Sequence, residues 1–270
     1  ATTGEELLAV ERAGGRRPDG NAVALSRDGG LLAAALGGSR VVVWDVTARD
    51  RLLAVEADPL AGCVGITPDG KVLVAAGVRH YRVRSWDVAS GKELNVYGGY
   101  VRRVRSIAFD GSGRTMVTGS GDGSVAVWDV STRSRTHTFD AVEGSVASVA
   151  VSRDGGAVAV GGARGEALLY DMNEDAPREV HRVRAGGSTT VSLRHDGAAL
   201  AVASGRLQLW PSNPATEPQA GKRSCAWGGD LRVNASGARA LTTHGNSTVT
   251  LWDIERGVSL ATFAAPAAPK

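Results

Sequence analysis

The sequence contains no set of residues with the spacing that catalysis requires. Neither a G-x-S-x-G nucleophile elbow nor an H-E-x-x-H metal motif occurs in its 270 residues. The segment Gly119–Gly123 has the glycine content of a phosphate loop, but an apolar strand pattern follows it, so no helix N-terminus is offered to a phosphate. We interpret this segment as a hairpin turn. We expect no catalytic residue and no cofactor.

Histidine and cysteine do not indicate a metal site either. The five histidines are expected in loops or turns of the chain, without the mutual spacing of metal ligands: His80, His137, His181, His195 and His244. Cys63 and Cys225 have no neighbouring cysteine or histidine cluster, so neither a zinc site nor a disulfide framework is predicted. Two free thiols suit a reducing compartment, and we expect a cytoplasmic protein.

Composition narrows the class of protein further. Apolar residues make up 43% and charged residues 22% of the chain, which is typical of a globular domain. No apolar run approaches the roughly 20 residues that a membrane span needs, so no membrane partner is expected. A formal net charge of +3 is too small for a dedicated nucleic-acid binder. Nucleic acid is therefore not the partner we expect.

Two series of residues recur in register along most of the chain. Aromatic residues, mostly followed by Asp, recur at intervals of 42, 42, 42, 40 and 42 residues: Trp44-Asp45, Trp86-Asp87, Trp128-Asp129, Tyr170-Asp171, Trp210-Pro211 and Trp252-Asp253. A turn dipeptide precedes each ring by 14 to 17 residues: Asp28-Gly29, Asp69-Gly70, Ser112-Gly113, Asp154-Gly155, Asp196-Gly197 and Ser236-Gly237. Two independent markers that keep one period predict a protein built from repeats.

Each repeat has the pattern of four short strands, which we name a to d. In the first repeat the strands are expected at Val23–Ser26, Leu31–Ala35, Val41–Trp44 and Arg51–Val55. An Asp-Gly pair between apolar runs is a hairpin signal, so the repeat is predicted to be an antiparallel meander. Val41–Val43 is apolar on both faces and needs cover on both sides. Four-stranded sheets stacked face to face provide that cover, which predicts a β-propeller.

The repeats resemble the WD-repeat β-propeller family. The residues that are typical of it are Ser90–Leu94 after Trp86-Asp87 and Met116–Gly123 before Trp128-Asp129. The resemblance spans nearly the whole chain and implies an all-β propeller of four-stranded antiparallel blades. Arginine, alanine and glycine, whose codons are GC-rich, are abundant, and we expect a member of bacterial type.

The family implies a hydrogen-bonded tetrad in each blade, made of a His, a Ser or Thr, an Asp and the Trp. Only the third repeat keeps Thr118, Asp122 and Trp128, and Tyr100 stands where the His is expected. The resemblance also implies that the Asp after each ring accepts N–H groups of the next turn. Because the other repeats lack the full tetrad, we expect apolar packing to supply most of their rigidity.

We predict a single domain over residues 1–270 with six complete repeats. Their ranges are 20–58, 59–99, 100–141, 142–185, 186–221 and 222–265, followed by a tail at 266–270. Residues 1–12 align with strand d of the other repeats and lack an a, b and c strand of their own. Either the chain was cut from a longer, seven-bladed protein, or a six-bladed ring closes with Leu7–Val10 and Ser259–Phe263 competing for one edge.

The fifth repeat departs from the pattern. Pro211 replaces the Asp after the ring and cannot donate to a sheet ladder. Residues 212–218, which include two further prolines, are expected to break strand d. We interpret this region as a frayed outer edge of its blade.

Basic and aromatic residues cluster in two connections that are predicted to open on one face. The b–c connection of the second repeat and the d–a connection into the third contain Arg79, His80, Tyr81, Arg82, Tyr100, Arg102 and Arg103. Tyr and Arg are enriched at binding hot spots, and Arg can clamp a carboxylate. The alternative is that an arginine-rich chain scatters these side chains over solvated loops. Arg178–Arg184 is expected to be a charge-protected strand edge.

The resemblance implies a non-enzymatic interaction scaffold or sensor. We expect a recognition domain of a larger bacterial signalling protein, which binds a peptide or protein, with acidic groups, on its loop face or contacts other domains of the parent polypeptide. One alternative is a propeller hydrolase or lyase with a site at the channel mouth. Another is nucleic-acid binding through arginine-rich loops, which predicts a steep salt dependence.

Overall fold

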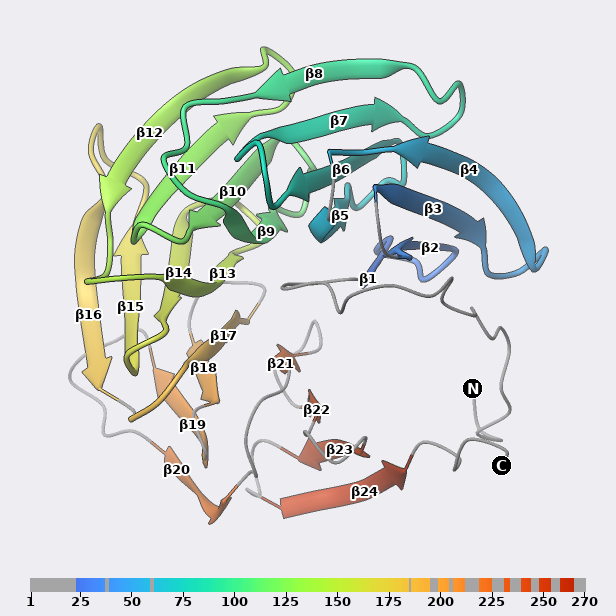
Figure 1. Cartoon of the computed structure of the whole chain (residues 1–270). Coiled ribbons are helices and arrows are strands. Elements are labelled where there is room, and N and C mark those ends of the chain that lie inside the picture. Colours follow the sequence, from blue (N-terminus) through green and yellow to red (C-terminus); the bar gives the residue numbers. More distant parts are fainter. Residues whose placement is uncertain are drawn as a thin grey trace. The chain divides into compact units, whose positions relative to one another are not determined.

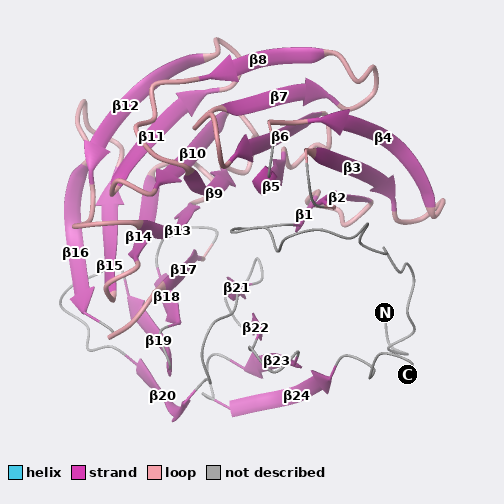
Figure 2. Cartoon of the chain, in the orientation of Figure 1, coloured by secondary structure: helices cyan, strands magenta, loops and turns pink. Residues whose placement is uncertain are grey.

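The computed structural model describes a chain whose regular elements, within the described ranges, are all β-strands (Figures 1 and 2). The described residues are 23–36, 39–58, 61–184, 186–194, 199–203, 206–211, 219–224, 231–233, 239–243, 248–253 and 258–264. Over these residues no helix has the length and apolar character that crossing a membrane would take. The predicted extra strand at residues 1–12 and the tail at 266–270 lie outside the described residues.

Within the described residues the strands form six four-stranded antiparallel sheets, each made of four consecutive strands. The first sheet contains β1 (Val23–Leu25), β2 (Leu31–Ala35), β3 (Arg40–Asp45) and β4 (Asp50–Glu56). The second contains β5 (Ala61–Ile66), β6 (Val72–Gly77), β7 (Val83–Asp87) and β8 (Glu93–Tyr97). The third contains β9 (Val104–Phe109), β10 (Thr115–Ser120), β11 (Ser124–Asp129) and β12 (Ser134–Asp140).

The remaining sheets repeat this order. The fourth contains β13 (Val146–Val151), β14 (Ala157–Gly162), β15 (Glu166–Asp171) and β16 (Arg178–Arg184). The fifth contains β17 (Thr190–Leu193), β18 (Ala199–Ala203), β19 (Arg206–Pro211) and β20 (Gln219–Ser224). The sixth contains β21 (Leu231–Val233), β22 (Arg239–Thr243), β23 (Thr248–Asp253) and β24 (Val258–Ala264). This repeated meander confirms the predicted fold class, an all-β protein of the β-propeller type.

The fifth repeat keeps a complete outer strand. The prolines after Trp210 were expected to leave a broken strand d, but β20 pairs antiparallel with β19. The strand is displaced along the sequence to Gln219–Ser224, beyond the proline-containing segment. The expectation of a broken strand d is corrected in part: β20 begins directly after Pro218, and its pairing with β19 has an irregularity between Arg206 and Gln208.

The chain divides into two compact units. The N-terminal unit comprises Ala1–Asp122 and Val127–Thr136, and the C-terminal unit comprises Gly123–Ala126 and His137–Lys270. In the N-terminal unit, Ala33, Val41 and Val43 of the first sheet join one buried cluster with Val64 and Leu73 of the second. In the C-terminal unit, an equivalent cluster joins β14 and β15 to β17. Each core thus lies between neighbouring sheets.

The inner strands are buried on both faces, as the doubly apolar pattern predicts. Val41, Val42 and Val43 alternate in direction along β3, and all three are buried. The outer strand β4 has an exposed pattern instead. Between the third and fourth strands of four sheets the register shifts at the aromatic ring: Val43/Trp44, Ser85/Trp86, Leu169/Tyr170 and Leu251/Trp252. Such an irregularity bends the outer strand at the point where the ring is buried.

A side-chain hydrogen-bond loop closes the first hairpin of several sheets. In the first sheet the Ser26 hydroxyl donates to Asp28 Oδ1 at 2.6 Å and accepts the Leu31 N–H at 2.9 Å. The hydrogen bonds from Ser26 and from the Gly30 N–H hold the pKa of Asp28 below its usual range. Thr67 with Asp69 and Ser152 with Asp154 repeat the arrangement.

The third sheet contains the same loop with the two residue types exchanged. Here Asp110 accepts the Thr115 N–H at 3.1 Å, and the Ser112 hydroxyl donates to Asp110 at 2.8 Å. The carboxylate therefore takes the place that a hydroxyl has in the other hairpins. This exchange explains why the sequence shows Ser-Gly at this turn where its neighbours show Asp-Gly.

In the first four sheets the aspartate after the ring organises the turn into the outer strand, as the resemblance implied. Asp45 accepts the N–H groups of Thr47 and Ala48, both at 2.8 Å. Equivalent bonds reach Asp87, Asp129 and Asp171, and Asp253 ends β23. In three of these turns the fifth residue after the ring is left-handed, and in the second sheet it is Gly91 (φ 70°). The same position, five residues after the ring, is occupied by Arg49 (φ 59°) and Arg133 (φ 61°).

The strained arginine in this turn predicts a stabilising substitution. Arg49→Gly removes a left-handed Cβ, whose cost is about 1 kcal/mol, and part of that gain is offset by the greater entropy of glycine in the unfolded chain. We expect the free energy of unfolding to rise by roughly 0.5 kcal/mol, measured by urea denaturation. Arg51→Gly, in the exposed strand β4, is the matched control and should destabilise. A loss of stability in Arg49→Gly would contradict the assignment of strain.

Candidate functional site

A hydrogen-bonded aromatic cluster joins two strands of the third sheet to the connection that precedes it. The Trp128 indole N–H donates to Thr118 Oγ1 at 3.2 Å, and the Tyr100 hydroxyl lies 2.8 Å from the same oxygen. Thr118 is fully buried. Burial raises the pKa of Tyr100 well above its usual range. A single hydroxyl therefore ties β10, β11 and the β8–β9 connection together, with Tyr100 in the place of the family's histidine.

Rings and a cation surround this hydrogen-bonded group. Tyr97 packs edge-on against Trp128 at a centroid distance of 5.1 Å, and the Tyr100 ring lies 6.0 Å away. The Arg135 guanidinium lies 5.5 Å from the Trp128 centroid, within cation–π range. Asp122, the remaining tetrad residue, lies half-buried in the turn between β10 and β11. Trp128 is thus fixed on several sides.

A second threonine–tryptophan pair escaped the sequence analysis. In the sixth sheet the Trp252 N–H donates to Thr242 Oγ1 at 2.8 Å, and both side chains are buried. The signal was present, because Thr242 precedes Trp252 by ten residues, as Thr118 precedes Trp128. The pair was overlooked because the repeat lacks the tetrad's aspartate.

The other rings use different partners. The Arg84 guanidinium lies over the Trp86 ring, 5.1 Å from its centroid, and forms an ion pair with Glu93. The Tyr170 ring packs against Phe139 with a centroid distance of 4.6 Å, and burial raises the pKa of Tyr170 to about 12. Trp44 is half-buried in β3, and Trp210 lies in β19. The position of the ring is therefore common to the sheets, whereas its polar contacts are not.

The β6–β7 connection presents four exposed residues, Arg79, His80, Tyr81 and Arg82. It is closed by a hydrogen bond from the Gly77 N–H to the Arg82 carbonyl at 3.1 Å. Tyr81 is left-handed, with φ 52°, and its side chain is 40% exposed. The equivalent positions, five residues before the ring, are Gly123 (φ 98°) and Gly165 (φ 96°). A bulky aromatic residue thus occupies a position where glycine is the favoured residue.

The β8–β9 connection leaves the second sheet at the same end as the β6–β7 connection, because β6 and β8 run in the same direction in an antiparallel meander (Figure 1). Val101 is 77% exposed and Arg102 is also exposed. The connection is fixed through its backbone. The Arg102 carbonyl accepts the Ser120 hydroxyl at 3.3 Å, and the half-buried Arg103 accepts the Gly121 N–H at 2.9 Å.

We call the exposed residues of these two connections the basic edge: Arg79, His80, Tyr81, Arg82, Val101 and Arg102. Neither connection contains Asp or Glu. Over the described part of the chain, the side chains of Arg79, Arg82 and Arg102 form no ion pair. Tyr100, predicted with this cluster, has its hydroxyl on Thr118, so it holds the connection in place.

The arginines of β16 contrast with the basic edge. Arg178 pairs with Asp171 at 3.1 Å, and Arg182 pairs with Glu179 at 2.7 Å. Arg182 and Arg184 also approach Glu166. These cations are neutralised locally, which supports the expectation that this stretch is a charge-protected strand edge.

Two histidines lie elsewhere than expected. His137 lies in β12 and His181 in β16, so the expectation of loops is wrong for these residues. Both belong to outer strands, whose polar pattern hides their strand character in the sequence. The described residues contain no group of three or more His, Cys, Asp or Glu side chains that could hold a metal ion.

Comparisons with known proteins agree with this fold. Residues 91–129 match the WD40 family model, the WD domain or G-beta repeat. A stretch of 71 residues, 26% of this chain, is 37% identical to the target of rapamycin complex subunit wat1 of Schizosaccharomyces pombe and covers 23% of that protein. A chain in the crystal structure of the mitotic checkpoint complex is similar with a TM-score of 0.78 and 18% identity, over 91% of this chain and 77% of that one.

These likenesses support a WD-repeat propeller, a fold that typically serves as a non-enzymatic interaction scaffold. The expectation of bacterial type gains no support, because the curated relative comes from fission yeast. The likeness to the checkpoint structure concerns the fold alone.

The Tyr100–Thr118 contact predicts a measurable coupling. Tyr100→Phe should lower the free energy of unfolding by roughly 1 kcal/mol, because it removes a buried hydrogen bond. In a double-mutant cycle with Thr118→Ala we expect a coupling of about 0.5–1.5 kcal/mol, measured by urea denaturation. Tyr97→Phe is the matched control, since the Tyr97 hydroxyl has no hydrogen bond to the described residues. Additive effects of the first two substitutions would refute the coupling.

Proposed function

We propose that this chain is a non-enzymatic scaffold that binds an acidic segment of a partner protein on the basic edge. The observation that carries this proposal is the combination of unpaired arginines with exposed Tyr81 and Val101 in connections that lack any acidic residue. Apolar side chains surrounded by uncompensated cations match a segment that combines carboxylates with apolar residues.

Strain at Tyr81 supports the proposal. A left-handed conformation costs a bulky residue roughly 1–3 kcal/mol, and such outliers are concentrated at ligand contacts. Glycine would relieve the strain, as it does at the same position of the third and fourth sheets. The tyrosine therefore contributes something that the fold does not need, and a rigid aromatic contact for a partner is the role we assign to it.

A fixed backbone also favours binding at this edge. Hydrogen bonds from Ser120 and Gly121 hold the β8–β9 connection, and the Gly77 bond closes the β6–β7 connection. A preorganised surface loses little conformational entropy when a partner binds. The side chains can then contribute most of their interaction energy to affinity.

The wider setting is part of the same proposal. The partner segment belongs to another protein or to another domain of a longer signalling polypeptide, and we place the protein in the cytoplasm. The buried, free thiol of Cys63, whose pKa burial raises to about 12, suits a reducing compartment. No step of the proposal requires a catalytic residue.

Peptide binding tests the proposal directly. Wild-type chain is screened against an immobilised peptide library in which acidic and neutral sequences are matched, and hits are titrated by fluorescence anisotropy. We expect the peptides that bind to be acidic. The double variant Arg79→Glu/Arg102→Glu should lower their affinity at least roughly tenfold, because charge reversal replaces attraction with repulsion.

The matched control is Arg27→Glu/Arg51→Glu, which makes the same charge change at exposed residues outside the basic edge. It should bind nearly as tightly as wild type. Equal binding by all three proteins would overturn the proposal. Stronger retention of single-stranded DNA than of any peptide, with a steep salt dependence, would assign the surface to nucleic acid instead.

A further inference from the structure

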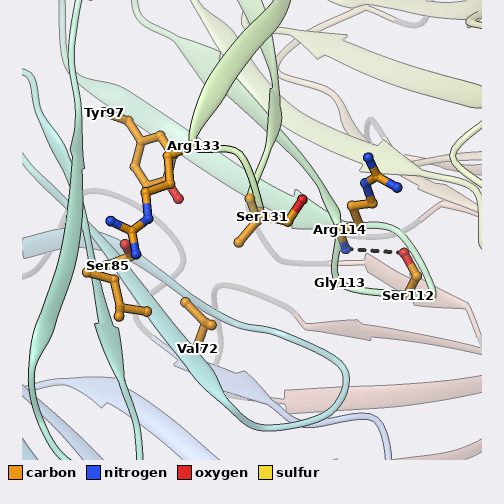
Figure 3. Close-up of a pocket in the computed structure, with 10 residues that line it drawn as sticks. Val72, Ser85, Tyr97, Ser112, Gly113, Arg114, Ser131 and Arg133 are labelled. Atoms are coloured by element: carbon orange, nitrogen blue, oxygen red, sulfur yellow. Dashed lines mark hydrogen bonds between the residues drawn. The ribbon is translucent and has the colours of Figure 1, made fainter.

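A concave feature of the N-terminal unit shares no residue with the basic edge. A cavity of about 520 Å³ lies among β6, β7, β8 and the turns β9–β10 and β11–β12 (Figure 3). Its volume falls within the range of small-molecule sites. Apolar side chains of Val72, Leu94 and Val130 form part of its lining, beside Ser85, Tyr97 and Arg133.

Two polar groups of the cavity, the Tyr97 hydroxyl and the Arg133 guanidinium, have donors without an acceptor among the described residues, and a third, the Ser85 hydroxyl, donates a long hydrogen bond. The Tyr97 side chain is only 2% exposed, yet its hydroxyl has no hydrogen bond to the described residues. Ser85 is 1% exposed, and its hydroxyl reaches only the Asn95 carbonyl, at 3.4 Å. The Arg133 guanidinium forms neither an ion pair nor a hydrogen bond with the described residues. Arg133 is exposed, and its donors together with the Tyr97 hydroxyl are available to a ligand that supplies acceptors.

The positions and ion pairs of the two arginines at the cavity decide which ligand charge the cavity favours. Figure 3 shows Arg133 extending toward Ser85 on the wall that Tyr97 also forms, with Arg114 on the other side. Arg114 is neutralised by Asp129 at 2.9 Å, and no Asp or Glu is among the residues that line the cavity. One free guanidinium therefore remains, which matches a monoanion better than a dianion.

We propose that this cavity binds a carboxylate attached to an apolar group. The carboxylate lies between the Arg133 guanidinium and the hydroxyls of Tyr97 and Ser85, and the apolar group packs on Val72, Leu94 and Val130. The left-handed Arg133 (φ 61°) aims its side chain from a position where the second sheet has Gly91. Two sources present this chemistry: a free organic acid, and the C-terminal apolar residue of a peptide.

Calorimetric titration of the full chain separates the sources and tests the site. The probes are 4-methylpentanoate and a hexapeptide ending in leucine, with either a free or an amidated C-terminus. We expect one carboxylate probe to bind and the amidated peptide to fail. Binding of the free acid identifies a small-molecule site, and binding of the free-ended peptide alone identifies a peptide terminus.

Variants at the cavity complete the test. Arg133→Gln should weaken carboxylate binding roughly 10- to 100-fold, since hydrogen bonds to a charged group are the strong ones. Tyr97→Phe should weaken it severalfold while leaving the urea midpoint nearly unchanged. Arg49→Gln, at the same turn position in the first sheet, is the matched control and should bind as wild type.

Three results would overturn the proposal: no carboxylate binding at millimolar concentration, equal binding by Arg133→Gln, or tighter binding of phenyl phosphate than of either carboxylate. The basic-edge variant Arg79→Glu/Arg102→Glu should retain carboxylate binding. The two proposals therefore fail independently.

Discussion

Inner strands that are apolar on both faces impose the constraint on which this structure depends. Val41, Val42 and Val43 are buried although they alternate in direction, so β3 needs packed side chains on both sides. In the N-terminal unit the cluster shared by the first two sheets provides such packing for Val41 and Val43. In four sheets the ring near the end of the third strand lies beside a register shift, where the packed inner strands meet the outer strand.

Because the inner strands are packed on both faces, the proposed binding residues lie in the connections between strands. The faces of the inner strands are occupied by core contacts, so exposed side chains lie on the outer strands and at the strand ends. Hydrogen bonds of the Ser26–Asp28 and Asp45–Thr47 kind hold the backbone there without using the neighbouring side chains. The cavity beside Arg133 lies on turns that are fixed in this way, whereas the connections of the basic edge are held by hydrogen bonds to the carbonyls of Arg82, Arg102 and Arg103. In many proteins a rigid scaffold likewise positions loops that carry the binding residues.

The polar network of the third sheet shows how the pattern tolerates substitution. Thr118 retains its bond to Trp128 although Tyr100 replaces a histidine, because a phenol, like an imidazole, can reach and hydrogen-bond the threonine hydroxyl. The sixth sheet keeps the threonine–tryptophan bond, and Trp86 has a cation above it instead. Apolar burial of the ring is common to these cases, so the hydrogen bonds refine a position that packing has already set.

The sequence alone determined the repeat, the strands and their turns, because period, apolar alternation and Asp-Gly pairs are local signals. It also located the basic edge apart from Val101, and the family resemblance pointed to the Thr118–Trp128 pair. Only the tertiary structure decided that Arg178 and Arg182 are neutralised while Arg79 and Arg102 are not, and that the Tyr100 hydroxyl faces Thr118. It alone placed Tyr97 beside Arg133 at one cavity. Ion pairing, burial and cavities depend on side chains from different strands and sheets, and no local pattern encodes which of them meet.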